Sequence, residues 1–240
     1  MACFMDGALG EGLVVMHQRL VRSQTTDGAA AVAPVVPSPL PKRALDVAGA
    51  SLGLVAAAPL LALSALAIKC TSRGPVLYSQ VRIGKEGAPF RIYKLRTMRA
   101  DAELRLAEVM HLNVHARDLG DGRMYKIADD PRVTKVGRFL RRFSLDELPQ
   151  LVNVVKGEMS LVGPRPLTPA EDCHVVGPAR RRSSVLPGVT GPWQVLGRNA
   201  IPFEEMMWLD CMYVGRWSFA TDLRLLARTI PAVLRGEQPC

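Results

Sequence analysis

The 240-residue sequence lacks several features that identify common kinds of functional site. Aromatic residues make up only 5% of it, which argues against a platform that stacks single-stranded nucleic acid. No G-x-x-x-x-G-K-[ST] loop is present, so a P-loop kinase is excluded. The five cysteines are scattered without a Cys-x-x-Cys pair, which disfavours a zinc site or a disulfide framework. Together with the lack of a cleavable signal, this favours a reduced, cytoplasm-facing domain.

Basic residues outnumber acidic residues, and one long stretch of the sequence contains no charged residue. The net charge of +9 predicts an anionic partner, either nucleic acid, anionic lipid or a phosphorylated substrate. Residues 47–68 contain no charged side chain. As a straight helix this run would cover roughly 33 Å, enough for a hydrocarbon core of about 30 Å. A buried core helix is the alternative. A nucleic-acid-binding protein would have no use for such a run.

Two membrane geometries are compatible with residues 47–68. Pro59 lies in the middle of the run, where proline removes a backbone hydrogen bond and kinks a helix. Basic residues flank both ends, and the positive-inside rule then favours both ends on the cytoplasmic side. A bent, re-entrant helix satisfies this rule, whereas a straight span leaves cations outside.

The pattern along the chain predicts a mostly helical α+β protein in three parts. We expect a poorly ordered leader at 1–41, a membrane helix at 42–72, and a cytosolic catalytic domain on the membrane surface at 73–240. Within this domain, residues 76–83 and 89–96 predict a β-hairpin around a Gly-Lys-Glu-Gly turn. Three further segments have helical periodicity and at least partly amphipathic faces: 100–115, the basic segment 132–143, and 221–235, which Pro231 should interrupt or kink.

Two adjacent carboxylates, Asp146 and Glu147, are the strongest candidates for chemistry. They follow an arginine-rich segment and precede a rigid Gly-Pro-Arg-Pro loop that contains Arg165. The sequence from Ser144 to Glu147 also matches a capping box, and Asp146 as N-cap is a second possible register. Both registers predict carboxylates at a helix N-terminus, where they or a phosphate would be stabilised. Two roles for these acids are therefore compatible with the sequence: helix capping, or phosphate chemistry in which they act as a metal ligand or a nucleophile.

Ordered motifs along most of the chain, from Lys42 to Gly236, make it resemble the bacterial sugar transferase family. These enzymes are small monotopic polyprenyl-phosphate phosphoglycosyl transferases that begin exopolysaccharide and glycoconjugate assembly. The motifs are residues 42–46, 93–98, 130–134, 144–150, 161–166, 187–194, 197–199, 213–214 and 217–218.

The resemblance implies an enzyme in which Asp146 and Glu147 are catalytic and bind Mg²⁺. Asp146 would attack the β-phosphate of a UDP-sugar, release UMP and form a phosphosugar-aspartyl ester, which undecaprenyl phosphate would then attack. Glu147 would hold the metal or assist proton movement. The matching substrate-binding positions are Lys94, Arg141, Arg165, Arg198 and Asn199, and Pro59 matches the family's break in a re-entrant helix.

The resemblance also implies the partners and location of the protein. We expect UDP-sugar, undecaprenyl phosphate and the lipid bilayer as partners, no nucleic acid, and a homodimer by analogy with larger relatives. The location would be the bacterial inner membrane, with the catalytic domain facing the cytoplasm. The N-terminal transmembrane block of larger relatives is expected to be absent. A catalytically silent membrane-surface scaffold of the same fold is the alternative function.

Overall fold

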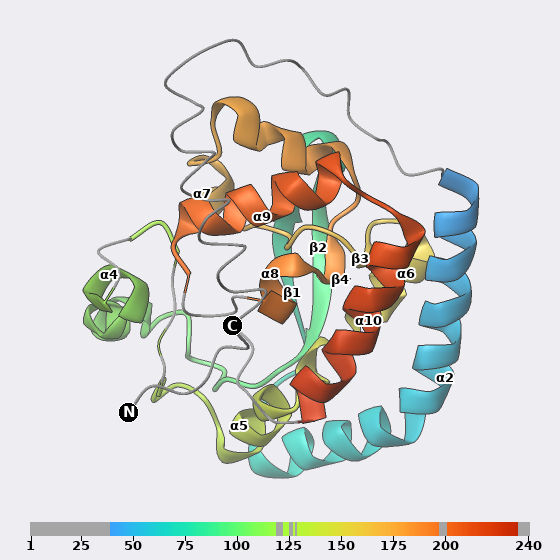
Figure 1. Ribbon diagram of the computed structural model, residues 1–240. Helices are drawn as coiled ribbons and strands as arrows, with labels where there is room; N and C mark the ends of the chain where they lie inside the picture. Colours follow the sequence, from blue (N-terminus) through green and yellow to red (C-terminus); the bar gives the residue numbers. More distant parts are fainter. Residues whose placement is uncertain (1–38, 119–121, 125–126, 128, 197–200, 235–240) are drawn as a thin grey trace, which may run out of the picture. The chain divides into compact units, whose positions relative to one another are not determined.

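The computed structural model of the chain divides into two units, residues 1–33 and 34–240. The structure describes residues 39–118, 122–124, 127, 129–196 and 201–234, all in the second unit. This part is mostly helical and contains two small two-stranded sheets (Figure 1). The predicted mixture of many helices and a small hairpin is confirmed.

The longest element is helix α2, Pro39–Thr71. It begins inside the predicted leader, because prolines in a first turn lose no intrahelical hydrogen bond; residues 1–38 of that leader lie outside the described part. Pro59 lies within the helix, and Figure 1 shows α2 as two arms that meet at a sharp bend. We attribute the bend to this proline.

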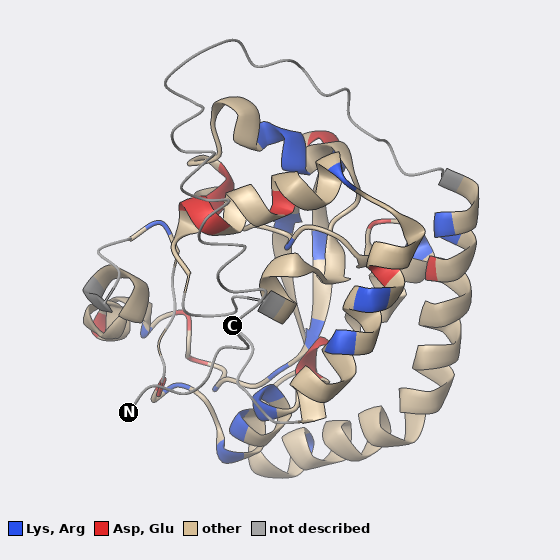
Figure 2. Ribbon diagram, in the orientation of Figure 1, with Lys and Arg blue, Asp and Glu red and all other residues tan. Residues whose placement is uncertain are grey.

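Most of α2 is exposed and apolar. In the part of the chain that the structure describes, it is the one helix long and apolar enough to cross a membrane, and 11% of its candidate span is buried. Charged residues lie near its beginning and in its last turn, which contains Lys69, and the long stretch between them is uncharged (Figure 2). Leu52 and Val55 are 71% and 74% exposed, which makes the alternative of a buried core helix wrong.

The charged start of α2 is bonded into the centre of the protein. Lys42 Nζ lies 2.5 Å from Asp222 Oδ2 and donates to the carbonyl of Val162 at 3.1 Å. Asp46 Oδ1 accepts from Ser160 Oγ at 3.0 Å and from the Leu161 amide at 2.9 Å. These buried contacts explain the Lys-Arg-x-x-Asp motif physically: it attaches the long apolar helix to β3 (Ser160–Val162) and α10 (Phe219–Leu234).

The predicted hairpin is confirmed almost residue for residue. Strands β1 (Leu77–Ile83) and β2 (Pro89–Leu95) pair antiparallel around the short 3-10 helix η1 (Lys85–Gly87). Helix α6 (Gln150–Lys156) packs on β2, and the buried side chain of Asn153 accepts from the Tyr93 amide at 3.2 Å. The hairpin is therefore held rigidly beside α6.

The continuous helix predicted at 100–115 is wrong. The chain forms turns, followed by α3 (Leu106–Val109), η2 (Met110–Leu112) and α4 (Val114–Asp118). Arg132 Nη1 donates to the carbonyl of Ala102 at 3.1 Å, a tertiary contact at the place where the helix was expected to begin. The predicted apolar stripe is also only partly buried, since Met110 is 50% exposed.

The other two predicted helices exist with changed limits. Helix α5 covers Lys135–Arg142 and begins after Thr134, whose hydroxyl accepts from the Gly137 amide. Its predicted apolar face is split, because Leu140 is 2% exposed and Phe139 is 57% exposed. Helix α10 covers Phe219–Leu234 and continues past Pro231, so the predicted interruption there is wrong.

A second sheet had no counterpart in the prediction. Strands β3 (Ser160–Val162) and β4 (Gly188–Thr190) pair in parallel, and both are only three residues long. The backbones approach so closely that a Cβ on Gly163 would lie 2.5 Å from the Leu186 carbonyl oxygen, and one on Gly188 would lie 2.1 Å from Gly163 N. These glycines therefore let the chain just after β3 and the chain that leads into β4 pack together.

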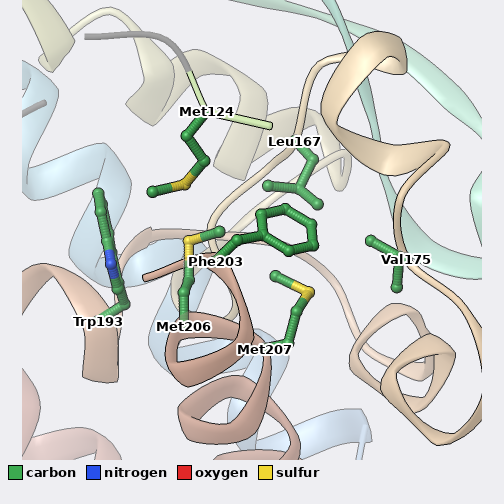
Figure 3. Packing of buried hydrophobic residues seen from close by; sticks show 7 residues of the cluster. All are labelled: Met124, Leu167, Val175, Trp193, Phe203, Met206 and Met207. Carbon is green, nitrogen blue, oxygen red and sulfur yellow. The ribbon is translucent and has the colours of Figure 1, made fainter. Parts of the chain in front are cut away.

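Four further elements lie near a core cluster of seven buried hydrophobic residues. They are α7 (Pro169–Asp172), η4 (Gly177–Ser184), α8 (Pro192–Leu196) and α9 (Phe203–Gly215). Figure 3 shows side chains from several of these segments converging around Phe203, with Trp193 at one side. This cluster fixes Trp193, which is 2% exposed, at the edge of the site described below.

The attachment of α2 leads to a stability prediction. Asp222→Asn should lower the free energy of unfolding by about 3 kcal/mol, because it removes the nearest counter-ion of the buried Lys42. Thermal unfolding in detergent micelles would measure the change. Asp101→Asn is the control: it breaks the exposed ion pair with Arg99 and should cost less than about 0.5 kcal/mol. Equal effects of the two variants would contradict the proposed importance of this attachment.

Candidate active site

The carboxylate pair lies in a separate 3-10 turn, η3 (Leu145–Glu147), between α5 and α6. Both predicted capping registers are wrong: Ser144 makes no side-chain cap and α6 begins only at Gln150. Ser144 has φ 54°, a left-handed conformation that is uncommon for a residue with a side chain. The chain reverses sharply at this residue and then presents the two acids from a short, tight turn.

Two leucines hold this turn from opposite sides. Leu145 packs against the cluster of Ile68, Leu95 and Leu140, to which Leu61 also belongs. Leu148 packs against the cluster that contains Ala50, Ile92 and Val154, together with Leu54. Each cluster includes residues of a different arm of α2, one before Pro59 and one after it. The two leucines that flank the acids therefore belong to clusters that include different arms of α2.

Glu147 forms a close ion pair with Lys94 of β2. The distance between Lys94 Nζ and Glu147 Oε1 is 2.6 Å, and both side chains are less than 20% exposed. Burial alone would raise the pKa of Glu147, but the charges of Lys94, Arg165 and Arg82 outweigh it and lower that pKa. Glu147 is therefore a carboxylate at neutral pH.

Asp146 has a different environment from its neighbour. It is 6% exposed, and its Oδ1 has no hydrogen-bond partner in the described part of the chain. Burial raises the pKa of Asp146 to about 6, with a further increase from the charge of Glu147, against the opposing charges of Lys94 and Arg141. This carboxylate oxygen is buried without a partner, and a metal ion or an electrophilic phosphorus would supply one.

Arg141 and Arg165 approach the pair from different elements. Arg141, on α5, donates from Nε to Thr97 Oγ1 at 2.9 Å and lies close enough to Asp146 for their charges to affect each other's pKa. Arg165 follows β3 in the Gly-Pro-Arg-Pro loop, and its guanidinium lies 5.0 Å from the centre of the Trp193 ring. The aromatic face supports the cation at a defined place.

A cavity of about 240 Å³ opens beside Glu147. Arg82, Lys94 and Arg165 line it together with this acid, so the charged lining has three cations and one anion. The remaining walls are largely apolar and include Val189 of β4 and Val233 of α10. Such a cavity suits a ligand that has an anionic group and an apolar portion.

The structure brings most of the predicted site residues together. Lys94, Glu147 and Arg165 line the cavity, whereas Asp146, in the same turn as Glu147, and Arg141, near the end of α5, do not. Arg198 and Asn199 lie outside the described residues. Pro59 lies within α2, away from the charged groups in sequence.

Sequence analysis missed Arg82 and Trp193. Arg82 is 9% exposed, its pKa is lowered to about 10 mainly by burial, and its Nε has no partner in the described part. From the sequence pattern alone, Arg82 has no role beyond being one of the basic residues that follow the apolar run. Its place inside a predicted apolar strand was the available signal, because a cation in such a position must either be paired or serve a ligand.

The donor set fits a magnesium ion that is shared with a substrate. Within the described residues, no group of three or more His, Cys, Asp or Glu side chains converges as a metal cage. Asp146 and Glu147 offer hard oxygen ligands, and Asp146 Oδ1 has no other partner. Mg²⁺ is commonly bound by one or two carboxylates plus substrate phosphates, which is the arrangement that this pair can support.

The comparisons with known proteins identify the family. A family model described as "Bacterial sugar transferase" matches residues 38–236, so the chain belongs to this family. It is 43% identical over 196 residues to the galactosyl transferase CpsE of Streptococcus agalactiae serotype III, with 81% of this chain and 42% of that protein covered. The chain thus spans about two fifths of that relative.

Shorter relatives are covered more completely. The chain is 41% identical over 196 residues to the exopolysaccharide production protein ExoY of Rhizobium meliloti, covering 80% of this chain and 84% of ExoY. It is 42% identical over 212 residues to the UDP-glucose:undecaprenyl-phosphate glucose-1-phosphate transferase of Caulobacter vibrioides, covering 85% and 73%.

Because Asp146 and Glu147 have opposite pKa shifts, replacing each acid by its amide should have opposite effects on the stability of the protein. The folded-state pKa of Asp146 is raised, so stability is lost as pH rises from about 4 to about 6 and the aspartate ionises. Asp146→Asn should therefore stabilise the protein at pH 7.5 by on the order of 1–3 kcal/mol, and this gain should vanish near pH 4.

Glu147→Gln is the matched contrast. The folded-state pKa of Glu147 is lowered, so its contribution is present at neutral pH and is lost on acidification. This variant should destabilise the protein at pH 7.5. Thermal unfolding of both variants across pH 4–8 would check the two signs, and the same sign for both would contradict this description of the site.

Proposed function

We propose that the chain is a phosphoglycosyl transferase that transfers a sugar 1-phosphate from a UDP-sugar to undecaprenyl phosphate. The observation that carries this proposal is the desolvated Asp146, with an unpaired Oδ1, beside a cation-lined cavity. The name of the Caulobacter relative, a UDP-glucose:undecaprenyl-phosphate glucose-1-phosphate transferase, supports the same reaction. The exposed apolar α2 supports a lipid-linked acceptor.

In the first step, Asp146 Oδ1 attacks the β-phosphorus of the UDP-sugar. A new oxygen–phosphorus bond forms while the bond from this phosphorus to the oxygen bridging the two phosphates breaks, and UMP leaves with the electron pair. The product on the enzyme is a phosphosugar-aspartyl ester. Weak solvation makes the Asp146 carboxylate a better nucleophile than a hydrated one, and its pKa of about 6 leaves it mostly ionised at neutral pH.

In the second step, a phosphate oxygen of undecaprenyl phosphate attacks the phosphorus of this ester. The bond to Asp146 breaks, which regenerates the carboxylate and yields the sugar-diphospho-polyprenol. Lys94 and Arg165 line the cavity and would contact the phosphate oxygens, and a guanidinium can bind two of them at once. Arg82 lines the same cavity and adds a third cation.

Glu147 acts as a fixed negative charge in this scheme. Its lowered pKa makes it a poor proton acceptor at neutral pH, which favours a role in holding the metal over a role in proton movement. Asp146 and Glu147 would hold Mg²⁺ together with the substrate diphosphate. When bound, the ion would neutralise charge on the transferring phosphoryl group and on the leaving UMP.

The proposed location is the bacterial inner membrane, with α2 re-entrant and the catalytic domain facing the cytoplasm. The bend at Pro59 supports a helix whose two ends lie on the same side, and basic residues near both ends support the cytoplasmic side. The site would then lie at the height of a polyprenyl phosphate head group.

Covalent labelling tests the reaction. A UDP-sugar labelled on its β-phosphate should label the protein before any polyprenol is added, and undecaprenyl phosphate should then remove the label. Asp146→Asn should abolish labelling but retain membrane association, and EDTA should suppress labelling of the wild type. Near wild-type turnover by Asp146→Asn would overturn the nucleophile assignment. A wild type that releases no UMP from any UDP-sugar would favour the silent scaffold.

Cysteine accessibility tests the topology. In a background with all five native cysteines replaced by serine, Leu40→Cys and Pro75→Cys are introduced separately. Both should be shielded from an impermeant maleimide in intact cells and labelled after permeabilisation, because both ends of a re-entrant helix face the cytoplasm. Labelling of only one position in intact cells would indicate a straight span.

A further inference from the structure

The loop that contains Arg165 is held through its carbonyl groups. Pro164 and Pro166 have no amide hydrogen, so this loop offers few backbone donors. The Pro164 carbonyl accepts from the Gly188 amide at 2.8 Å, and the Pro166 carbonyl accepts from Arg82 Nη1 at 3.1 Å. The carbonyl of Arg165 itself accepts from Arg182 Nη2 at 2.5 Å.

Arg182 reaches this carbonyl from a buried ion pair outside the cavity's charged lining. It lies in η4 and is 4% exposed, while its partner Asp210 lies in α9 and is 0% exposed. Asp210 Oδ2 accepts from Arg182 Nε at 3.0 Å and from Nη2 at 2.7 Å. One guanidinium nitrogen, Nη2, therefore donates both to the Asp210 carboxylate and to the Arg165 carbonyl.

We propose that Arg182, oriented by Asp210, is a positioning residue that sets where the Arg165 side chain lies in the cavity. The proposal rests on the proposed function, in which Arg165 contacts the substrate phosphates. Arg182 donates to the residue whose side chain carries that contact, and it does not itself line the cavity. Trp193 supports the guanidinium of Arg165 from its ring face, and Arg182 holds the backbone from which this side chain extends.

This arrangement is specific to a guanidinium. A lysine at position 182 would retain the positive charge opposite Asp210. It would present a single flexible ammonium instead of a planar fork, and could not reproduce the two-nitrogen contact with Asp210 while also binding the Arg165 carbonyl. Arg182→Lys therefore loosens the Arg165 backbone without leaving a buried charge unpaired.

A double-mutant cycle between positions 182 and 165 tests the proposal. In the wild-type background, Arg182→Lys should lower kcat/KM for UMP release about 10- to 100-fold, since small displacements of a positioning group have effects of this size. In the Arg165→Ala background, the same change should alter kcat/KM less than twofold, because there is no longer a side chain to position. The matched control is Arg180→Lys, in the same 3-10 helix, where a half-exposed arginine pairs with Asp172. It should leave both backgrounds unchanged.

The outcomes separate this inference from the proposed function. Equal losses from Arg182→Lys in both backgrounds, or no loss in the wild type, would overturn the positioning role while the transferase activity stands. A wild type without activity on any UDP-sugar would overturn the proposed function. The mutant cycle would then be measured by calorimetry as the affinity for UDP. Additive effects of the two substitutions on this affinity would overturn the positioning role. If Arg182→Lys does not fold, Asp210→Asn replaces it, because it preserves side-chain size and an oxygen acceptor. Asp210→Asn should lower kcat/KM when Arg165 is present and should have little effect in the Arg165→Ala background.

Discussion

The bend in α2 is the constraint on which the arrangement of the site depends. The arm before Pro59 contributes Ala50 and Leu54 to one core cluster, and the arm after it contributes Leu61 and Ile68 to another. The turn that carries the acids has one leucine in each cluster. The bent helix thus contributes to both of the clusters against which the leucines of the turn pack.

The two adjacent acids differ in their solvation and in their ion pairing. Glu147 is paired with Lys94 at 2.6 Å and remains ionised, whereas Asp146 is desolvated with an oxygen that has no partner. An unsatisfied buried carboxylate costs stability, and proteins retain such costs where a ligand or substrate is to be bound. The cations around the cavity offset part of this cost and leave an excess of positive charge for phosphate groups.

Local sequence patterns predicted those elements whose contacts are mainly local. The β-hairpin depends on alternating apolar strands and a glycine turn, and it formed with nearly the expected limits. The capping box at Ser144 is absent, because this residue has a left-handed conformation where an N-cap is extended, and Leu145 and Leu148 on either side of the acids pack into two tertiary clusters. The helix expected at 100–115 is interrupted near Ala102, whose carbonyl accepts a hydrogen bond from Arg132, 30 residues away in the sequence. In both cases tertiary contacts outweighed a modest local preference.

The sequence by itself determined the family, the membrane-suited apolar run with its central proline, and the chemical types of the site residues, because these are properties of composition and ordered motifs. Only the tertiary structure decided which acid is paired with Lys94, since that partner is 53 residues away, and that Arg82 belongs to the site. The pairing and burial of a charge depend on contacts between distant segments. These contacts set solvation, and solvation distinguishes Asp146 from Glu147 where the sequence shows only two neighbouring carboxylates.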